Sequence, residues 1–287
     1  MSIARRFEKA NAEPGSVHGI PETGGFSGAG TRPGSEVFSA AGLRQLDDVV
    51  RSARLASAAV ASSLLAPVPA GGDAAALTEQ HCVFDHCGLL LFPRTLDEGL
   101  RGLQQLGLAP SPVVPSTVVR RRLAERHGLD PADCDVRITR LRLGLPNGRR
   151  HAAVEVFLFP RDSRAYAPQV EEAEVVNGFE QHTAFVVARP STGLLTRLVA
   201  SWRIEAGLLT EGGGHNPHEG GPDGSTVMYF VREHDHPGLR RRFELHCPGD
   251  LTAFIAGLPE QTAAVRHAYA AWHPVDPVLA APPARSV

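Results

Sequence analysis

Lysine is almost absent from this chain of 287 residues. Lys9 is its only lysine, and the formal net charge at pH 7 is −2. Binding to nucleic acid relies on many contacts between basic side chains and phosphates, and a chain so nearly neutral gives no global electrostatic reason to expect it. We therefore expect no nucleic acid among its partners.

Long apolar runs are also missing. The N-terminus lacks the apolar core of a signal peptide. The longest weakly apolar stretch, Leu55 to Ala70, contains two prolines and is too short to span a bilayer. We expect no membrane segment and a cytoplasmic location.

Cysteine is scarce, and the four cysteines form no C-x-x-C pair. A zinc finger would need two closely spaced pairs, so we expect reduced and mostly buried thiols. Cys82 and Cys87 flank His86, which leaves thiolate ligation near this histidine as an alternative. Phosphate-binding and dinucleotide-binding glycine loops are absent, and so is the G-x-S-x-G motif of serine hydrolases.

The pattern that is present predicts four segments, and the 43% of hydrophobic residues is enough for a real core. A flexible arm rich in Gly, Pro, Ser and Glu runs to about residue 36, and helical spacing follows over 40–65. The predicted segments are this arm and helix (1–78), a first module (79–165), a second module (175–258) and a C-terminal helix and tail (259–287).

The first module combines a buried strand with a helix and two further strands. Thr95 and Glu98 form a capping box, which predicts a helix start. Apolar residues alternate with arginine from Val136, which is typical of a half-buried strand. The expected elements are a strand (83–92), a helix (96–106), an inserted helix (116–127) and strands over 136–145 and 151–159, joined by a turn at 146–148.

The second module repeats this order. The expected elements are a strand (181–188), a helix (190–207), a loop with the sequence GGGHNPHEGG (212–221) and strands over 226–232 and 240–246, and a closing helix (259–272) follows the module. Each copy opens on a histidine and ends on a glutamate. The separation is 69 residues from His86 to Glu155 and 62 residues from His182 to Glu244.

The pieces FDHCGLLLFPRTLDEGLRGLQQLGL, AVEVFLF, QHTAFVVA and RRFELH resemble the vicinal oxygen chelate superfamily, which includes glyoxalase I, fosfomycin-resistance proteins and extradiol dioxygenases. The resemblance covers about 170 of the 287 residues. It implies an α+β fold in which two βαβββ modules form a metal-binding cleft, here with an N-terminal helical extension. It also permits a homodimer with exchanged modules.

The resemblance assigns metal ligation to His86, Glu155, His182 and Glu244. Glu155 and Glu244 lie among apolar strand residues, where burial of a carboxylate is unfavourable unless a cation compensates it. Histidine and carboxylate ligands suit Fe(II), which we expect, and also Mn, Ni, Co and Zn.

The number of ligands separates two reaction types. All four would resemble glyoxalase-like isomerases, in which a glutamate moves the proton. His86, His182 and Glu244 alone would form the facial triad of non-haem Fe(II) oxygenases. The role of Glu155 therefore decides between these chemistries.

The order of His, Tyr, Asp-x-Pro-Gly and Glu in the second module is similar to that of extradiol dioxygenases. This similarity assigns catalytic roles to His215, His218 and Tyr229. A histidine can transfer the proton of a substrate hydroxyl, and a tyrosine can hydrogen-bond a substrate oxygen. The preferred hypothesis is an Fe(II)-dependent dioxygenase that uses O₂ on a small oxygen-chelating metabolite.

Other interpretations stay open at this point. One is a redox-neutral, metal-dependent isomerase or lyase, and another is a metal-free protein that binds or sequesters a small molecule. A competing metal cluster would use His234, His236 and His246. The arginine runs 120–122 and 240–242 are expected to be solvated faces, or to meet an anionic substrate group at the rim of the cleft.

Overall fold

The computed structural model describes residues 37–144, 150–235, 238–259 and 261–272. Three expected features lie outside the described residues: the flexible arm up to about residue 36, the turn at 146–148 and the tail beyond Pro274.

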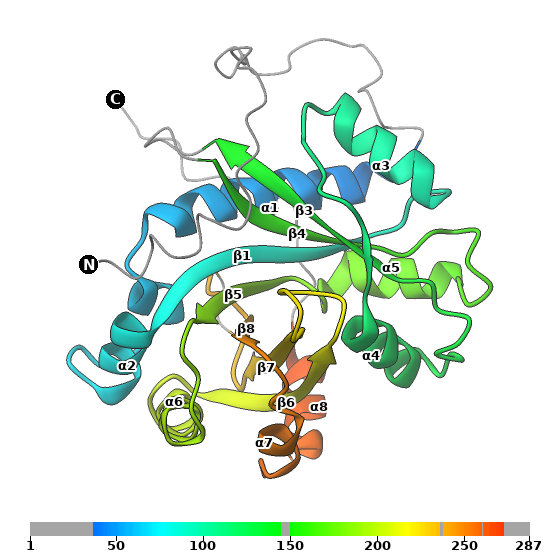
Figure 1. Cartoon of the computed structure of the whole chain (residues 1–287). Coiled ribbons are helices and arrows are strands. Elements are labelled where there is room, and N and C mark those ends of the chain that lie inside the picture. Colours follow the sequence, from blue (N-terminus) through cyan, green and yellow to red (C-terminus); the bar gives the residue numbers. More distant parts are fainter. Residues whose placement is uncertain (1–36, 145–149, 236–237, 260, 273–287) are drawn as a thin grey trace, which may run out of the picture. The chain divides into compact units, whose positions relative to one another are not determined.

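One curled, mixed sheet forms the centre of the described unit (Figure 1). Its strands follow the order β2-β3-β4-β1-β5-β8-β7-β6. The strands are β1 (Cys82–Leu91), β2 (Val114–Pro115), β3 (Arg137–Gly144), β4 (Arg150–Leu158), β5 (His182–Val187), β6 (Leu208–Asn216), β7 (Ser225–Arg232) and β8 (Arg242–Pro248).

The sheet contains the same unit twice. Counted from its middle, the first half runs β1, β4, β3, β2 and the second half runs β5, β8, β7, β6. The pairs β1–β4 and β5–β8 are parallel, and β1 and β5 join the halves in antiparallel fashion. Helices α3 (Leu96–Gln105) and α6 (Thr192–Glu205) each follow the first strand of their half. The expected α+β fold of two βαβββ units is confirmed.

Hydroxyl side chains begin several helices. The Oγ1 atom of Thr95 accepts a hydrogen bond from the amide of Glu98 at 3.2 Å, which confirms the predicted start of α3. Ser116 caps α4 (Thr117–His127) in the same way, and Gly128 ends this helix with a φ of 65°. The inserted helix expected over 116–127 is thus present.

Other elements differ from expectation. The predicted helix over 40–65 is divided into α1 (Ala40–Ala58) and the short 3-10 helix η3 (Ala61–Leu65). Residues 212–216, expected in a loop, belong to strand β6. Elements that the sequence did not indicate are β2, α2 (Asp73–His81), α5 (Pro168–Asn177) and α7 (Thr252–Ala256), whereas α8 (Thr262–Ala271) matches the expected closing helix.

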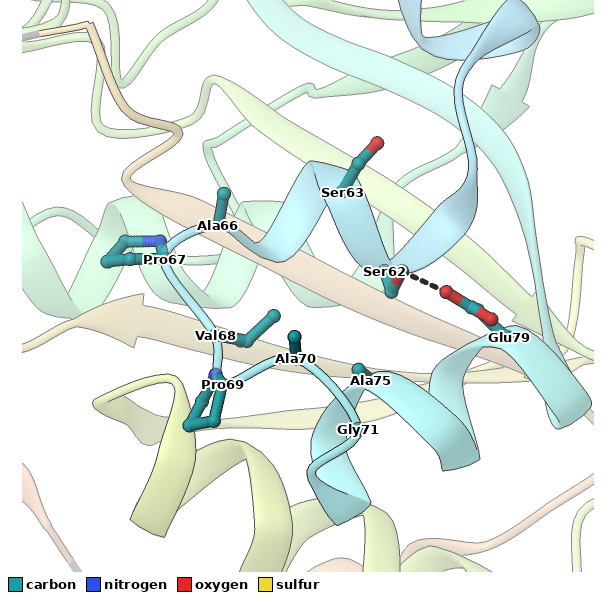
Figure 2. Close-up of a pocket in the computed structure, with 10 residues that line it drawn as sticks. All are labelled: Ser62, Ser63, Ala66, Pro67, Val68, Pro69, Ala70, Gly71, Ala75 and Glu79. Carbon is teal, nitrogen blue, oxygen red and sulfur yellow. Dashed lines mark hydrogen bonds between the residues drawn. The ribbon is translucent and has the colours of Figure 1, made fainter.

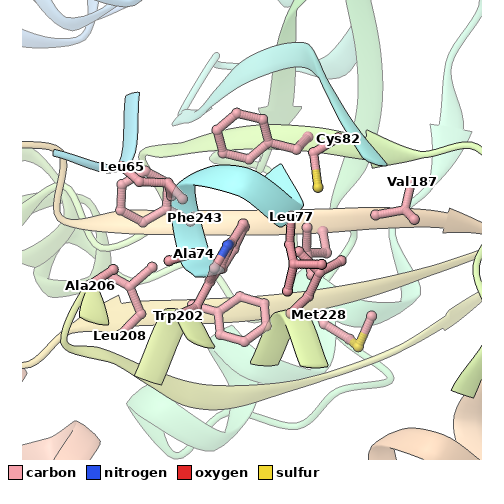
Figure 3. Close-up of a cluster of buried hydrophobic side chains, with 14 of the residues drawn as sticks. Leu65, Ala74, Leu77, Cys82, Val187, Trp202, Ala206, Leu208, Met228 and Phe243 are labelled. Atoms are coloured by element: carbon pink, nitrogen blue, oxygen red, sulfur yellow. The ribbon is translucent and has the colours of Figure 1, made fainter. Parts of the chain in front are cut away.

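Helices cover the back of the sheet with two apolar clusters. Behind β1 and β4, α1 and α3 contribute leucines such as Leu43 and Leu103. Behind β5, β7 and β8, Trp202 of α6 is fully buried against Phe243 (Figure 3). Its indole Nε1 atom donates to Oγ1 of Thr78 on α2 at 2.9 Å. Burial of side chains this large supplies much of the hydrophobic stabilisation.

The front of the sheet is covered by α4 and α8. Leu123 of α4 packs on the first half, and Val118 of the same helix contacts Tyr229 and Val227 on β7. Helix α8 covers the outer end of the second half through Val265. The insertion in the first unit therefore lies over both halves of the front face.

A surface hollow lies between η3 and α2, and its lining includes Ser62, Pro67 and Glu79 (Figure 2).

All four cysteines are buried free thiols, as expected. Within the described part of the chain, no helix combines the length and the apolar character that crossing a bilayer requires.

Candidate metal centre

Four buried side chains converge on the front of the sheet. They come from the four central strands: His86 from β1, Glu155 from β4, His182 from β5 and Glu244 from β8. One nitrogen or oxygen atom of each lies within 4.8 Å of those of the others, and no residue of the set is more than 5% exposed. The structure thus brings together all four residues to which the resemblance assigned ligation.

Strand register explains this convergence. Gly88 pairs with Glu155 on one side and with His182 on the other, and Ala184 pairs with His86 and Glu244. Side chains two residues apart on a strand share a face, so both rows present their polar residues to the front. Each half of the sheet supplies one histidine and one glutamate from equivalent strands.

The distances between these atoms match the spacing of ligands around one ion. The Nε2 atoms of His86 and His182 are 3.3 Å apart, and Nε2 of His182 lies 3.2 Å from Oε2 of Glu244. Nε2 of His86 lies 3.5 Å from Oε2 of Glu155 and 4.0 Å from Oε1 of Glu244. Two atoms bound at about 2.1 Å to one ion, at a right angle, are about 3 Å apart.

Both histidines are oriented through their other ring nitrogen. The Nδ1 atom of His182 donates to the backbone carbonyl of Glu180 at 2.7 Å. The Nδ1 atom of His86 donates to Oδ2 of Asp85 at 2.8 Å. These bonds place the proton on Nδ1 and leave the lone pair of Nε2 facing the cluster, which is the arrangement of metal-binding imidazoles.

The donor set fits a divalent cation. Two Nε2 lone pairs and two carboxylates face one another, and none of the described residues donates a hydrogen bond to Oε2 of Glu244. Burial, together with the nearby Arg140, lowers the pKa of His86, which favours its neutral form. Neutral imidazoles and carboxylates are ligands for iron, manganese, nickel, cobalt and zinc.

The two glutamates differ in their affinity for a proton. Burial alone would raise the pKa of Glu244, but the adjacent imidazoles of His182 and His86 lower it. For Glu155, burial and the neighbouring Glu219 raise the pKa well above its usual range, although Arg140 opposes them. A bound cation would supply the compensation that the ionised form of Glu155 lacks.

Arg140 on β3 links this centre to its surroundings. Its Nε and Nη2 atoms lie 3.0 Å from Oε1 of Glu155, and its Nη1 atom lies 3.0 Å from Oδ2 of Asp85. Its Nη2 atom also lies 2.9 Å from Oε1 of Glu219, which belongs to the segment between β6 and β7. One guanidinium therefore contacts a candidate ligand, the carboxylate that orients His86, and a carboxylate from the other half.

A second group of charges lies beside Tyr229 on β7. The ring of Tyr229 is 2% exposed, with Arg122 and Arg242 at 4.0 and 4.2 Å from its centroid, and it makes an edge contact with His182. Both arginines, together with Arg126, bind the buried carboxylate of Glu180. The residue whose carbonyl orients His182 is thus itself held by three arginines.

The residues expected to be catalytic lie at different places. Tyr229 neighbours the cluster, with its ring centroid 5.5 Å from that of His182. His215 pairs with Thr226, three positions from Tyr229, so its side chain belongs to the back face. His218 is exposed and its amide donates to Asn216. The structure therefore brings only Tyr229 of these three residues close to the candidate ligands.

Two further expectations are affected. His234 is exposed and His236 lies outside the described residues, whereas His246 lies near the centre, with Nδ1 3.6 Å from Oδ2 of Asp85. The expectation that both arginine runs are solvated faces is wrong for Arg122 and Arg242, because both enter the buried network around Glu180.

Sequence reasoning missed the residues that support the centre, namely Asp85, Arg140, Glu180 and Glu219. Asp85 directly precedes His86, and this pairing is the one available local signal. The contacts of the other three residues join segments that are far apart in sequence.

No family model and no curated protein matches the chain. Solved structures do. A Streptomyces coelicolor methylmalonyl-CoA epimerase variant with 2-nitronate-propionyl-CoA is 17% identical, with 58% of this chain and 98% of that chain covered and a TM-score of 0.31. A Streptomyces coelicolor 4-hydroxymandelate synthase variant is 11% identical, with 67% and 53% covered and a TM-score of 0.27.

Both proteins belong to the vicinal oxygen chelate superfamily. Likenesses as distant as these carry no conclusion about activity. The order and the directions of the eight strands stand independently of them. This topology of two βαβββ units in one curled sheet is the arrangement that the sequence resemblance implied.

Proposed function

We propose that the chain is a divalent-metal-dependent enzyme that acts on a small molecule with neighbouring oxygen atoms. His86, His182, Glu155 and Glu244 would hold the metal. The observation that carries this proposal is the convergence of two unprotonated Nε2 atoms and two carboxylates at distances of 3.2 to 4.0 Å. Among the described residues, no hydrogen bond to Oε2 of Glu244 explains why these groups lie so close together.

The reaction that the four-residue set supports best is a redox-neutral proton transfer, as in an isomerase or lyase. A divalent cation, when bound, polarises a substrate oxygen and makes a proton on the adjacent carbon more acidic. Glu155 is positioned to accept that proton, because its Oε2 atom lies at the centre, 3.5 Å from Nε2 of His86. Arg140 holds the Oε1 atom of Glu155, which leaves Oε2 turned toward the centre.

The surrounding residues exclude water and fix orientation. Val118 of α4 packs over Tyr229, and the four candidate ligands are almost fully buried. A centre without bulk water strengthens electrostatic interactions with the substrate. Asp85 and the carbonyl of Glu180 hold both imidazoles in one tautomer while a proton moves elsewhere.

An Fe(II)-dependent dioxygenase is the second candidate, and one contact favours it. The Nε and Nη2 atoms of Arg140 both approach Oε1 of Glu155, so only Oε2 is left for a metal and this carboxylate would be a weaker ligand than Glu244. Without Glu155, the set reduces to His86, His182 and Glu244, which is the triad of non-haem iron oxygenases.

Metal analysis of anaerobically purified protein tests the proposal. We expect about one divalent ion per chain in the wild type, and loss of that ion in His86→Ala and Glu244→Ala. Glu125→Ala is the matched control, because the Glu125 side chain is 71% exposed on α4 and lies outside the cluster. Absence of stoichiometric metal from every preparation would refute both enzyme hypotheses and leave a metal-free binding protein.

A Glu155→Ala variant separates the two reaction classes. The isomerase hypothesis predicts that this variant loses activity and much of its metal affinity, with no oxygen consumption by the wild type. The dioxygenase hypothesis predicts that the variant keeps full metal content and that the wild type consumes O₂ with its substrate. An oxygen electrode and metal analysis on the same samples decide between them.

A further inference from the structure

Access to the buried centre differs between its two sides. On the side of α4, Val118 and Tyr229 pack together, and Arg122 lies over the ring of Tyr229. The other side is formed by partly exposed polar side chains, which we call the polar rim: Asp85 (13% exposed), Arg140 (21%), Glu219 (13%) and His246 (11%). Among the described residues, the polar rim therefore offers a polar side of the centre that keeps some contact with solvent.

Glu219 is the member of the polar rim that belongs to a connecting segment. It lies between β6 and β7 of the second unit, and its Oε1 atom contacts Nη2 of Arg140 in the first unit at 2.9 Å. Its Oε2 atom accepts a longer bond of 3.4 Å from Nδ2 of Asn216. Gly220 and Gly221 follow with φ values of 82° and 116°, which gives this segment a backbone that side-chain-bearing residues rarely adopt.

Arg140 has more carboxylate partners than one positive charge can neutralise. Asp85 and Glu155 lie on central strands and also have other partners. Asp85 accepts a hydrogen bond from His86, and Glu155 is a candidate metal ligand. Glu219 neither orients a histidine nor belongs to the candidate metal ligands. A carboxylate from outside can therefore take the place of Glu219 on Arg140 with a bond of the same kind and little electrostatic cost.

His246 supplies a further polar atom beside this position. It is two residues from Glu244 on β8, so it shares the front face, and its Nδ1 atom lies 3.6 Å from the same Asp85 oxygen that Arg140 contacts. Its Nε2 atom is buried and has no hydrogen-bond partner among the residues that the structure describes. A buried polar atom without a partner costs free energy, and a ligand that bonds to it would recover that cost.

We propose that Glu219 occupies the binding position of a substrate carboxylate. The substrate then carries a carboxylate in addition to the neighbouring oxygens that bind the metal. This carboxylate pairs with Arg140 and accepts from Nε2 of His246, and the segment of Glu219 moves away. The inference rests on the proposed function, because it names the substrate class of the same centre.

Two small probe molecules that differ in one carboxylate test this assignment. They are 1,2-dihydroxybenzene and 3,4-dihydroxybenzoate, titrated into the cobalt-loaded protein and followed by the visible spectrum of the metal. In Glu219→Gln the internal carboxylate is gone, so we expect affinity for 3,4-dihydroxybenzoate to rise about 10-fold, with affinity for 1,2-dihydroxybenzene changed less than about 2-fold. Glu125→Gln is the exposed control and should match the wild type.

The outcomes separate this inference from the proposed function. Unchanged affinity for both molecules in Glu219→Gln, or an equal rise for both, overturns the carboxylate assignment while the metal site stands. Failure of the wild type to bind cobalt refutes the proposed function instead.

Hydrogen exchange then tests the carboxylate assignment without metal. Benzoate should speed amide exchange over residues 217–224 in the wild type and have no effect in Glu219→Gln. Equal exchange with and without benzoate in the metal-free wild type overturns the assignment by itself.

Discussion

The imidazole of His182 lies directly over Gly88 of the neighbouring strand. A Cβ atom at Gly88 would come within 2.1 Å of Cε1 and 2.5 Å of Nε2 of that ring. Glycine is required here because the ring occupies the space of a side chain. In the equivalent place of the other half, Ala184 pairs with His86. Small residues between the two histidines thus allow both imidazoles to turn toward one point.

Gly88→Ala should displace His182 and disrupt the candidate metal centre without unfolding the chain. The added methyl group collides with the ring rather than with the backbone, so the ring must rotate away. We expect metal affinity to fall at least about 10-fold, by titration against a chromophoric chelator. Gly193→Ala on α6 is the control, because nothing lies within 4 Å of its Cβ position. Unchanged affinity in Gly88→Ala would contradict the geometry.

Asp85→Asn should weaken metal binding although Asp85 is not among the four candidate ligands. The carboxylate accepts from Nδ1 of His86 at 2.8 Å, and an amide replaces it with a weaker and less basic acceptor. Loss of such a partner typically reduces metal affinity about 10- to 100-fold. Asp97→Asn at the exposed start of α3 should leave affinity unchanged. The same chelator competition measures both variants, and equal affinities would argue against an orienting role.

Glu180→Gln should strongly destabilise the fold. The carboxylate is fully buried and bound by Arg122, Arg126 and Arg242, so its removal leaves these arginines with insufficient negative charge. Removing one partner of a buried ion network costs about 3–5 kcal/mol. Urea denaturation measures the free energy of unfolding. A loss below about 1 kcal/mol, similar to that expected for the exposed control Glu125→Gln, would show that the network contributes little.

Glu174→Gln should change how stability depends on pH. Burial and the nearby Glu180 raise the pKa of Glu174 to about 7 in the folded chain, whereas the unfolded chain has a value near 4.5. The folded protein therefore binds this proton more tightly, and the associated stability is complete below pH 4.5 and lost as pH rises through 7.

Glutamine cannot ionise, so the variant should gain stability relative to the wild type between pH 5 and pH 7.5, by on the order of 2 kcal/mol. Urea denaturation at both pH values measures the difference. A constant difference between the two proteins would contradict a raised pKa.

The sequence predicted six of the eight strands from local signals, and the resemblance placed the four candidate ligands on the first and last strands of the two units. Apolar runs around His86 and His182 indicate buried strands, and the closing strands each contain one glutamate. Strand β6 was not predicted, because Gly212 to Gly214 carry no side chains that could alternate between apolar and polar. Only pairing with β7 reveals the reason for glycine, since a Cβ at Gly213 would lie 2.0 Å from the carbonyl oxygen of Val227.

The supporting charges were not predictable in the same way. The alternation of arginine and apolar residues on β3 suggested that the arginines face solvent, but the alternation breaks at Thr139. Arg140 consequently shares the front face with Ile138 and meets Glu155. The bonds from Arg122 and Arg126 to Glu180 span 58 and 54 residues, and no local pattern encodes them.

The two halves of the sheet are equivalent in topology but not in chemistry. Arg140 pairs with Glu155 on one side, and at the corresponding position Tyr229 pairs with Glu244 on the other. A site with true twofold symmetry would accept an unsymmetrical molecule equally well in either of two opposite poses. The exchange of a cation for an aromatic ring removes this ambiguity, because a molecule at the centre would meet different side chains on its two sides. The repeated topology thus brings the four candidate ligands together, and the difference between one pair of residues gives the centre a direction.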